Sequence, residues 1–437
     1  MLDLFKAHLV DNFPYLENKQ LLMAISGGLD SVVLTRLLHQ LGYNITLVHC
    51  NFKLRQQESD LDEQFVTNLA DDLRLGLHTI QFDTVTYAKN HNQSIQLAAR
   101  ELRYNWFRKL LNTNQFDFVI TAHHADDNLE TLLINLTRGT GLDGLTGIPE
   151  RNQNIIRPFL KFSRETILHY ANSKNWVWRE DQSNSNTKYL RNKIRHEVVP
   201  ILKTINPNIT EQVYKTTMFL KDTQHLVDDH VAHLNTQIQS ESDSVKKFNI
   251  KKILSLPHPK AYLYQVFKKY PFKEWDNIFD LLTSQTGKYL STKRHILLKN
   301  RDFLLLSPAH KEIASKKDVF YIDKKEKLLE FPLKLKIEIT KNIKVDDKNS
   351  ILVDKNLVFY PLILRRWKKG DLIYPSGMNG KKKVSKYFKD EKMSLFEKQN
   401  TWLLCSKTND IVWIVGKRQD RRFMINNNTS TILKLSI

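Results

Sequence analysis

Short apolar runs and segments of helical periodicity alternate along the first 200 residues. The apolar runs lie at 21–25, 45–49, 77–82 and 118–122, and the segments between them carry apolar residues at helical spacing. This alternation predicts repeated β-α-β units. Because parallel strands joined by helical crossovers form a doubly wound sheet, we expect an α/β fold whose ligands lie at the carboxyl ends of the strands.

The pattern changes after residue 210. From 210 to 320 the sequence is mostly helical in pattern, and beyond 350 short strand-like runs alternate with turns. A chain of 437 residues is long enough for two or three separate cores. We therefore predict three domains: an α/β domain over 1–210, a mostly helical domain over 211–325 and a small β-rich domain over 350–437.

The sequence SGGLDS at 26–31 follows the first apolar run and opens into a predicted helix. Gly27 and Gly28 can adopt positive φ and let backbone N–H groups approach a polyphosphate, and the helix N-terminus adds about half a positive charge. The Walker pattern does not fit, because no lysine follows the glycines. Asp30 predicts a bound Mg²⁺, which one or two carboxylates and phosphate oxygens usually hold. A plain turn with a helix cap is the alternative.

Arginines follow the second strand and line a predicted helix. Arg55, in VHCNFKLR, can bind phosphate or carboxylate through two N–H groups. Arg100 and Arg103, in AARELRY, have a spacing that places them on one helical face. A surface arginine in the first case and a solvated basic face in the second are the alternatives.

The fourth strand runs into AHHADDNLET at 122–131. Asp127 and Glu130 stand three residues apart at a helix start, so they share a face that points toward the ligand crevice. Such carboxylates can hold a metal, bind a substrate ammonium group or accept a proton. Acids in the first turn of an ordinary helix are the alternative. The two adjacent histidines point to opposite sides, so we do not expect them to ligate one metal.

Two further basic segments are candidates for RNA contacts. Arg191 and Arg195, in RNKIR, lie one helical turn apart, which suits phosphate and sugar contacts as well as a plain surface helix. Near the C-terminus five lysines interleave with two aromatic residues: Lys381, Lys382, Lys383, Lys386, Tyr387, Phe388 and Lys389. This patch is predicted to bind an RNA backbone, and a solubilising surface is the alternative.

Lysine and arginine outnumber aspartate and glutamate by 67 to 47, which gives a formal net charge of +20. This excess favours a long polyanionic partner, although a generally basic proteome would give the same balance. The only cysteines, Cys50 and Cys405, lie far apart and outside any CxxC, so we expect neither disulfides nor a zinc site. The acidic amphipathic start and the lack of a long apolar run predict a soluble, cytoplasmic protein without a membrane segment.

The ordered set of motifs closely resembles the tRNA(Ile)-lysidine synthetases, a branch of the PP-loop ATPases. The motifs are SGGLDS, VHCNFKLR, AARELRY, AHHADDNLET, RGTGLDGL, RPFL and WREDQSN with RNKIR. They cover about the first 200 residues, and the resemblance resumes at 364–392 and 411–423. Phe52 departs from the family, which usually has a histidine there. This departure puts a polar role at that position in doubt.

The resemblance implies a ligase that forms a C–N bond. In that family, ATP adenylates the C2 carbonyl oxygen of the wobble cytidine in the CAU anticodon of an isoleucine tRNA. The side-chain amine of L-lysine then displaces AMP, which gives lysidine and changes decoding from AUG to AUA. The resemblance also implies that the α/β domain binds ATP and that the helical and C-terminal domains recognise tRNA.

The expected site residues fall into three groups. The ATP and Mg²⁺ site comprises Ser26, Gly27, Gly28, Leu29, Asp30 and Ser31, with Arg55 as a further phosphate contact. Asp127 and Glu130 join Asp30 as catalytic residues, either at a metal or at the lysine ammonium group. The expected tRNA contacts are Arg100, Arg103, Arg191, Arg195, Lys381, Lys382 and Lys383.

Two other functions compete with this prediction. A PP-loop tRNA thiolase also adenylates a base, but such enzymes normally use paired catalytic cysteines, and Cys50 and Cys405 do not form such a pair. A non-catalytic tRNA-binding protein with a relic nucleotide fold would explain the charge. The intact acids Asp30, Asp127 and Glu130 argue against it.

Overall fold

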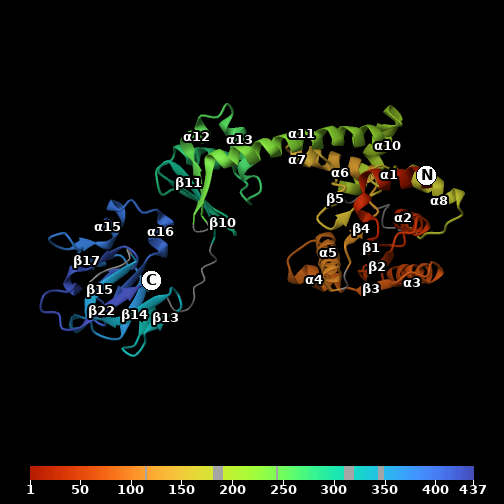
Figure 1. Cartoon of the computed structure of the whole chain (residues 1–437). Helices are drawn as coiled ribbons and strands as arrows, with labels where there is room; N and C mark the ends of the chain where they lie inside the picture. The colour runs from red at the N-terminus through yellow and green to blue at the C-terminus, as the bar shows by residue number, and fades with distance from the viewer. Residues whose placement is uncertain (114–115, 181–189, 243–244, 310–318, 343–348) are drawn as a thin grey trace. The chain divides into compact units, whose positions relative to one another are not determined.

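The computed structural model describes the chain except for residues 114–115, 181–189, 243–244, 310–318 and 343–348. The chain forms two compact units, Met1–Asp228 and Asp229–Ile437 (Figure 1).

A six-stranded sheet forms the centre of the first unit. The strands are β1 (Leu21–Ala24), β2 (Ile45–Asn51), β3 (Leu77–Gln81), β4 (Phe118–Ile120), β5 (Arg151–Asn152) and β6 (Ile155–Ile156). Their order is β3-β2-β1-β4-β6-β5, and all neighbours are parallel except β5 and β6. The strand order reverses between β1 and β4, which is where sheets of this kind bind their ligands.

Helices cover both faces of this sheet. The helices that begin in this unit are α1 (Leu2–Asn12), α2 (Leu29–Gln40), α3 (Gln57–Asp72), α4 (Thr84–Asn90), α5 (Ile95–Thr113), α6 (Ala125–Arg138), α7 (Leu142–Leu145), α8 (Arg164–Ser173), α9 (Leu190–Lys193), α10 (Val199–Ile205) and α11 (Ile209–Ile238). Alternate strand residues face opposite cores. Leu21 and Met23 pack with α1, α2, α3 and α8, whereas Leu22 and Val48 pack with α5. Burial on both faces explains why the strands appear as continuous apolar runs in the sequence.

The predicted doubly wound sheet is confirmed, and each of the four predicted strands is present with its end shifted by at most two residues. The hairpin of β5 and β6 was not predicted. Its strands have two residues each, which is too short for a periodic pattern.

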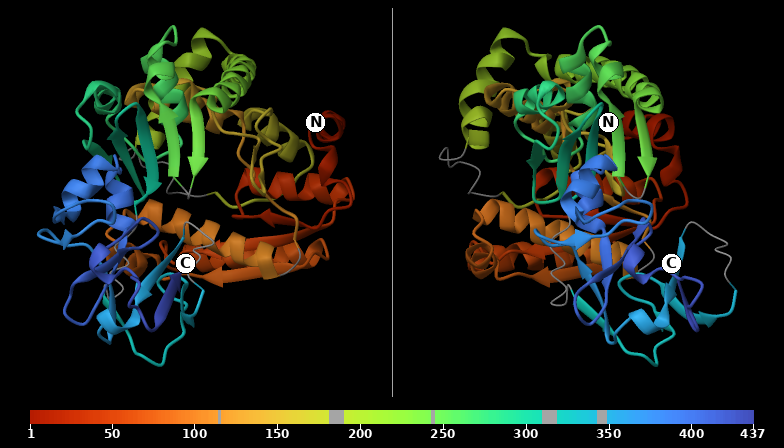
Figure 2. Two further views of the ribbon diagram at one scale, coloured as in Figure 1. Left: turned by 60° about the vertical axis from the view of Figure 1, so that its left-hand side comes forward. Right: turned by 90° about the vertical axis from the view of Figure 1, so that its left-hand side faces the viewer.

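The second unit begins with the end of α11 and a five-stranded antiparallel sheet. The sheet order is β7-β8-β11-β10-β9, formed by β7 (Gln239–Ser242), β8 (Val245–Asn249), β9 (Tyr289–Ser291), β10 (His295–Asn300) and β11 (Phe303–Pro308). In both views of Figure 2 these strands, coloured green to teal, run alongside one another. Three short helices share a core with them, namely α12 (Ile250–Leu254), α13 (Pro259–Phe267) and α14 (Trp275–Thr283). Helices therefore form in this stretch as predicted, but the five-stranded sheet that packs with them was not predicted.

The C-terminal part of this unit is rich in strands, as predicted. One sheet has the order β12-β16-β19-β20-β21 and a second has the order β13-β14-β22-β15. The strands are β12 (Val319–Ile322), β13 (Leu328–Leu329), β14 (Leu335–Thr340), β15 (Ser350–Asp354), β16 (Leu362–Arg366), β19 (Trp402–Cys405), β20 (Ile411–Ile414), β21 (Arg418–Gln419) and β22 (Ile432–Ser436). A small β17 (Leu372–Ile373) and β18 (Lys382–Lys383) pair precedes α15 (Val384–Asp390) and α16 (Leu395–Asn400). Within the described ranges, no helix combines the length and the apolar character that crossing a bilayer requires.

Candidate active site

Hydrogen bonds within the loop between β1 and α2 fix its shape. Gly27 has a φ of 87°, in the region that favours glycine, and a Cβ there would lie 3.4 Å from the ring of Phe65. Ser31 Oγ donates to the carbonyl of Gly28 at 2.9 Å and accepts from the backbone N–H of Ser26 at 3.2 Å. The loop therefore forms the tight strand-to-helix turn that the sequence predicts, with α2 beginning directly after Gly28.

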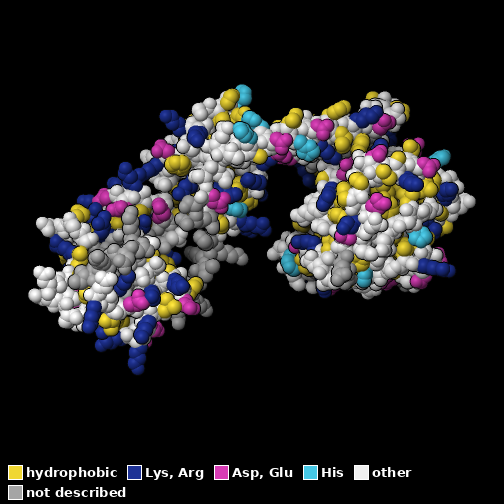
Figure 3. Space-filling view, in the orientation of Figure 1, with side chains coloured by type: hydrophobic (Ala, Val, Ile, Leu, Met, Phe, Trp, Pro, Cys, Tyr) yellow, Lys and Arg dark blue, Asp and Glu magenta, His cyan; other side chains and the backbone are white. Residues whose placement is uncertain are grey.

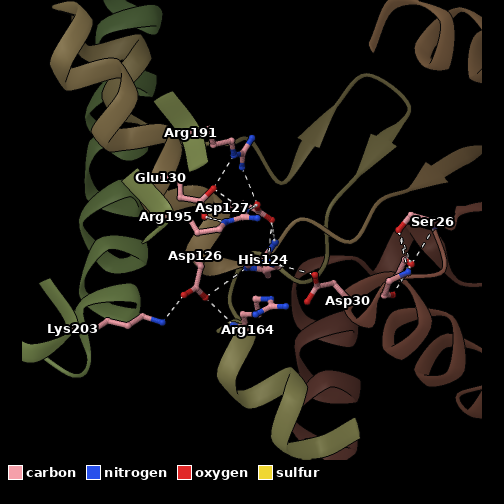
Figure 4. Close-up of polar contacts among 12 residues, drawn as sticks. Ser26, Asp30, His124, Asp126, Asp127, Glu130, Arg164, Arg191, Arg195 and Lys203 are labelled. Carbon is pink, nitrogen blue, oxygen red and sulfur yellow. Dashed lines mark hydrogen bonds and ion pairs between the residues drawn. The ribbon is translucent and has the colours of Figure 1, made fainter. Parts of the chain in front are cut away.

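Asp30 lies in the first turn of α2, and its side chain points toward His124 (Figure 4). Its Oδ1 is buried without a hydrogen-bond partner among the described residues, and burial raises the pKa of its carboxyl group. An unpartnered carboxylate oxygen is a suitable ligand for a hard cation. In the described part of the chain, no group of three or more His, Cys, Asp or Glu side chains could hold a metal ion. The observation that fits a Mg²⁺ ion held by one carboxylate and by phosphate oxygens is the unpartnered oxygen of Asp30.

His124 precedes α6 and is surrounded by three carboxylates. Its Nε2 lies 3.7 Å from Asp30 Oδ2 and 3.4 Å from Asp127 Oδ2, and its Nδ1 lies 3.6 Å from Asp126. Burial alone would lower the pKa of His124, but the charges of Asp127, Asp126 and Asp30 raise it to about 9. The three carboxylates therefore favour the imidazolium form of His124, which connects Asp30 of α2 to the acids of α6.

Asp127 and Glu130 lie on the same face of α6, as their spacing predicts, and both accept hydrogen bonds from two arginines (Figure 4). Arg191 donates from Nε to Glu130 at 2.7 Å and from Nη2 to Asp127 at 2.8 Å. Arg195 donates to Glu130 at 2.5 Å and 3.0 Å, and to Asp127 at 3.3 Å. Burial would raise the pKa of Asp127, but the charges of His124 and Arg191 lower it to about 2. We call these four residues the acid–arginine cluster.

Asp126 is a support for this cluster that sequence reasoning did not single out. Its Oδ1 accepts from Lys203 Nζ at 2.6 Å, and its Oδ2 accepts from the backbone N–H of Arg164 at 2.8 Å. Burial would raise its pKa, but the contacts with His124, Arg164 and Lys203 lower it. Asp126 thus connects α6 to the start of α8 and to α10, and it holds His124 from the side opposite Asp30.

Arg55, a predicted phosphate contact, is paired with an acid of α3. Its Nη2 donates to Asp62 Oδ2 at 2.5 Å. The other oxygen of Asp62 accepts from Arg179 Nε, also at 2.5 Å. Arg179 belongs to the WREDQSN motif, whose residues 181–184 lie outside the described residues. No local sequence pattern predicts the pair of Arg179 and Asp62, because 117 positions separate the two residues.

Arg100 and Arg103 are exposed on α5, and each lies over an aromatic ring. The guanidinium of Arg100 is 4.8 Å from the ring centroid of Tyr104, and that of Arg103 is 5.1 Å from that of Phe52. Phe52 in turn stacks on Phe82 with centroids 5.7 Å apart. The residue that departs from the family pattern therefore makes an aromatic contact with an arginine that we expect to bind RNA.

The lysine patch lies in the second unit, and its aromatic neighbours are not part of its surface. Lys381 and Lys383 are exposed, and Lys382 pairs with Asp390 at 2.7 Å. The expectation that Tyr387 and Phe388 belong to the patch is wrong, because both are buried in the apolar core below it. Lys386 and Lys389 stand three residues apart on one exposed face of α15, so the aromatic side chains between them face the core. On the face that Figure 3 shows, lysine and arginine side chains are spread over both units, with acids among them.

Comparison with known proteins matches three stretches of the chain to family models. Residues 3–202 match the PP-loop domain, residues 240–309 match the TilS substrate binding domain, and residues 362–436 match the TilS substrate C-terminal domain. The loop and the acid–arginine cluster both belong to the stretch that matches the PP-loop domain.

Whole-length relatives share one name. A tRNA(Ile)-lysidine synthase of Parabacteroides distasonis is 38% identical to this chain and covers 95% of each sequence. The same-named protein of Bacteroides thetaiotaomicron is 35% identical, over 96% of this chain and 95% of its own. That of Bacillus subtilis is 29% identical over 92% and 91%.

Proposed function

The chain belongs to the tRNA(Ile)-lysidine synthase family, and on this basis we propose that it joins L-lysine to C2 of the wobble cytidine in a CAU anticodon. The reaction consumes ATP through an adenylated tRNA and releases pyrophosphate and AMP. Its product, lysidine, changes decoding from AUG to AUA.

One structural observation carries this proposal. A continuous chain of charged contacts joins the phosphate loop to the acid–arginine cluster. It runs from Asp30 through His124 to Asp127. A two-step ligation requires the nucleotide and the amino acid to reach the same atom in succession. The adjacency of an anion-binding loop and a cluster that fits an amino acid supports this requirement.

The first step is attack by the cytidine C2 carbonyl oxygen on the α-phosphorus of ATP, with pyrophosphate as the leaving group. This step needs in-line positioning and charge neutralisation more than proton transfer. We assign the pyrophosphate to the N–H groups and hydroxyls of the loop: Ser26, Gly27, Gly28, Leu29 and Ser31. Arg55, which binds Asp62 of α3, would add positive charge to the pyrophosphate site. Mg²⁺, where bound, would be held by Asp30 and would neutralise phosphate charge.

In the second step the side-chain amine of lysine attacks C2 and AMP leaves with the C2 oxygen. The acid–arginine cluster combines two carboxylates with two guanidinium groups. These charges are complementary to the carboxylate and the ammonium groups of a free amino acid. Arg191 and Arg195 would bind the carboxylate of lysine, and Asp127 and Glu130 would bind its ammonium charge. The side-chain ammonium group must give up one proton before its nitrogen can attack C2, and the carboxylates of Asp127 and Glu130 are the acceptors that the cluster offers. The nitrogen loses a second proton to water or to the departing AMP once the C–N bond has formed.

Most of the contacts with tRNA are assigned to basic residues outside this cluster. Arg100 and Arg103 would contact the wobble cytidine or its phosphate, since unpaired anticodon bases are read on their edges. Lys381, Lys382 and Lys383 would bind the phosphate backbone elsewhere on the tRNA. We assign tRNA recognition to the domains expected over 211–325 and 350–437, with Arg191 and Arg195 as further phosphate contacts once lysine is absent.

The proposal is tested by incubating the full-length protein with ATP, Mg²⁺, radiolabelled lysine and a tRNA transcript that carries the CAU anticodon. We expect lysine to become attached to the tRNA, and nuclease digestion with mass spectrometry to place it on the wobble cytidine. A transcript with a UAU anticodon serves as the control and should stay unlabelled. Absence of label in the CAU transcript at saturating ATP would overturn the proposal.

A tRNA thiolase is the competing enzyme, and the cysteines disfavour it. Cys50 lies on β2, whereas Cys405 lies on β19 of the other unit, and burial raises the pKa of each thiol to about 12. A thiol with so high a pKa is a poor nucleophile at neutral pH. Replacement of both cysteines by serine should therefore leave lysidine formation intact.

A further inference from the structure

Arg179 bridges the phosphate loop and α3 through three contacts. Its backbone N–H donates to the carbonyl of Gly27 at 3.0 Å. Its Nε donates to Asp62 at 2.5 Å, and its Nη2 donates to Glu58 at 2.6 Å. The side chain of Arg179 is only 27% exposed and that of Asp62 only 11%, so water screens this pair less than an exposed one.

The contact with Gly27 bears on how the loop binds phosphate. A loop that binds an anion must present N–H groups to it, and its carbonyl groups need partners elsewhere. The carbonyl of Gly28 is occupied by Ser31 Oγ and by the N–H of Val32. The carbonyl of Gly27 is occupied by Arg179. Arg179 thus completes the set of contacts that satisfies the acceptors of both glycines within the protein.

The ion pairs explain why Arg179 stays in place. Two carboxylates of α3 hold its guanidinium, and Asp62 also accepts from Arg55 at 2.5 Å. One buried carboxylate therefore binds both Arg55 and Arg179. Residues 176–180 have no regular secondary structure, so these side-chain contacts anchor the backbone of Arg179.

We propose that Arg179 is a positioning residue that holds the loop at Gly27 in its phosphate-binding shape, with Asp62 and Glu58 as its anchors. This inference rests on the function proposed above, because it concerns the ATP that the loop binds. Arg179 acts on ATP through the loop and does not itself take part in bond making or breaking.

Two arginine variants separate the side chain from the backbone contact. Arg179→Ala keeps the N–H but removes both ion pairs, whereas Arg179→Pro removes the N–H as well. Val177→Pro is the matched proline control, because the N–H of this exposed residue has no hydrogen-bond partner among the described residues. Asp60→Asn is the matched charge control on α3, since Asp60 contacts Lys53 and Asn51 but not the loop.

Binding of the α,β-methylene analogue of ATP to each full-length variant is measured by calorimetry with Mg²⁺, together with steady-state lysidine formation. For Arg179→Ala we expect the dissociation constant of the analogue and the KM for ATP to rise about 5- to 20-fold, as when a charge-assisted hydrogen bond is removed. The KM for tRNA and kcat should change less than about threefold, because the substitution affects ATP alone. Arg179→Lys should recover part of the ATP affinity, and Arg179→Pro should bind the analogue most weakly.

Each outcome decides the inference. If Arg179→Ala binds the analogue like the wild type, or if kcat and the affinity for tRNA fall with ATP affinity in the same proportion, Arg179 has no specific effect on the loop. If Val177→Pro or Asp60→Asn reduces ATP affinity equally, the effect is a general one on the fold. If the wild type binds the analogue but forms no lysidine, the proposed function fails, and the binding measurements still test Arg179.

Discussion

Arg195 holds Glu130 through two parallel hydrogen bonds, from Nε to Oε1 at 2.5 Å and from Nη2 to Oε2 at 3.0 Å. The Glu130 side chain is 1% exposed, so neither charge of this pair can be removed without leaving the other poorly compensated. A lysine that binds here must therefore offer its carboxylate to Arg195 or an ammonium group to Glu130 in place of the partner that it displaces. The substitutions that test this cluster should be isosteric for this reason.

Glu130→Gln and Asp127→Asn should each reduce lysidine formation by about 100-fold or more, because they remove charge that binds or deprotonates the amine. Single-turnover pyrophosphate release should persist, since adenylation precedes lysine attack. Alanine variants should also fail to form the product. Circular dichroism checks that the fold is retained. Wild-type turnover in both variants would mean that the pair only supports the start of α6.

Asp30→Asn should abolish release of both AMP and pyrophosphate while leaving tRNA affinity nearly unchanged. The carboxylate faces phosphate and metal rather than RNA, and its amide cannot replace a charged ligand of Mg²⁺. A pyrophosphate-release assay across a Mg²⁺ titration measures the first effect, and a filter-binding assay measures the second. Normal turnover at saturating Mg²⁺ would contradict the assignment of Asp30.

Replacing Lys381, Lys382 and Lys383 together by alanine should weaken tRNA binding and flatten its salt dependence. The slope of log affinity against log salt should fall by roughly 0.7 to 0.9 for each phosphate that the variant no longer neutralises. Turnover at saturating tRNA should change much less, because the lysines lie in the unit that lacks the phosphate loop. A triple variant with wild-type slope and affinity would show that these lysines are only a solvated surface.

His123 should make the first unit less stable in acid. Burial, with the charges of Arg157 and Arg191, lowers the pKa of His123 to about 4, and this outweighs the opposite effect of Asp127. Below about pH 6.5 His123 therefore binds a proton in the unfolded chain but stays neutral in the folded unit. The free energy of unfolding should decrease as pH falls from about 6.5 toward 4, by up to about 3 kcal/mol.

The His123→Gln variant should show a flatter dependence over that pH window. Hydrogen exchange of the amides of β1 and β4, followed by mass spectrometry, reports the stability of this unit alone. His91→Gln, at the exposed end of α4, is the control and should follow the wild type. Parallel curves for all three proteins would remove His123 as the source of acid sensitivity.

Phe52→Leu should raise the dissociation constant for tRNA about threefold, because an exposed cation–π contact is worth about 0.5–1 kcal/mol and holds Arg103 in place. Phe52→Tyr keeps the ring and should bind like the wild type. Arg108→Ala, on the same helix but bonded to Asn105, is the charge control. Equal affinities for Phe52→Leu and the wild type would show that the ring does not position Arg103.

Features that depend on local order along the chain could be predicted without the structure. Apolar runs buried on two faces specify the strands of the doubly wound sheet, and two glycines between a strand and a helix specify the loop before α2. The helical period alone puts Asp127 and Glu130 on one face. The order of the motifs was enough to indicate the family, because an ordered set is specific even where each motif is short.

Which charges meet could be learned only from the folded protein. Arg191 and Arg195 look like a solvated basic edge in the sequence, yet they lie against acids more than sixty positions away. Arg179 likewise pairs with Asp62, an acid 117 positions away. Tyr387 and Phe388 pack into a core, which the lysines around them in the sequence do not indicate. The pKa of His124 depends on acids from two helices. Local sequence patterns specify secondary structure, but pairing of distant charges depends on how the helices pack on the sheet, which no short window of sequence contains.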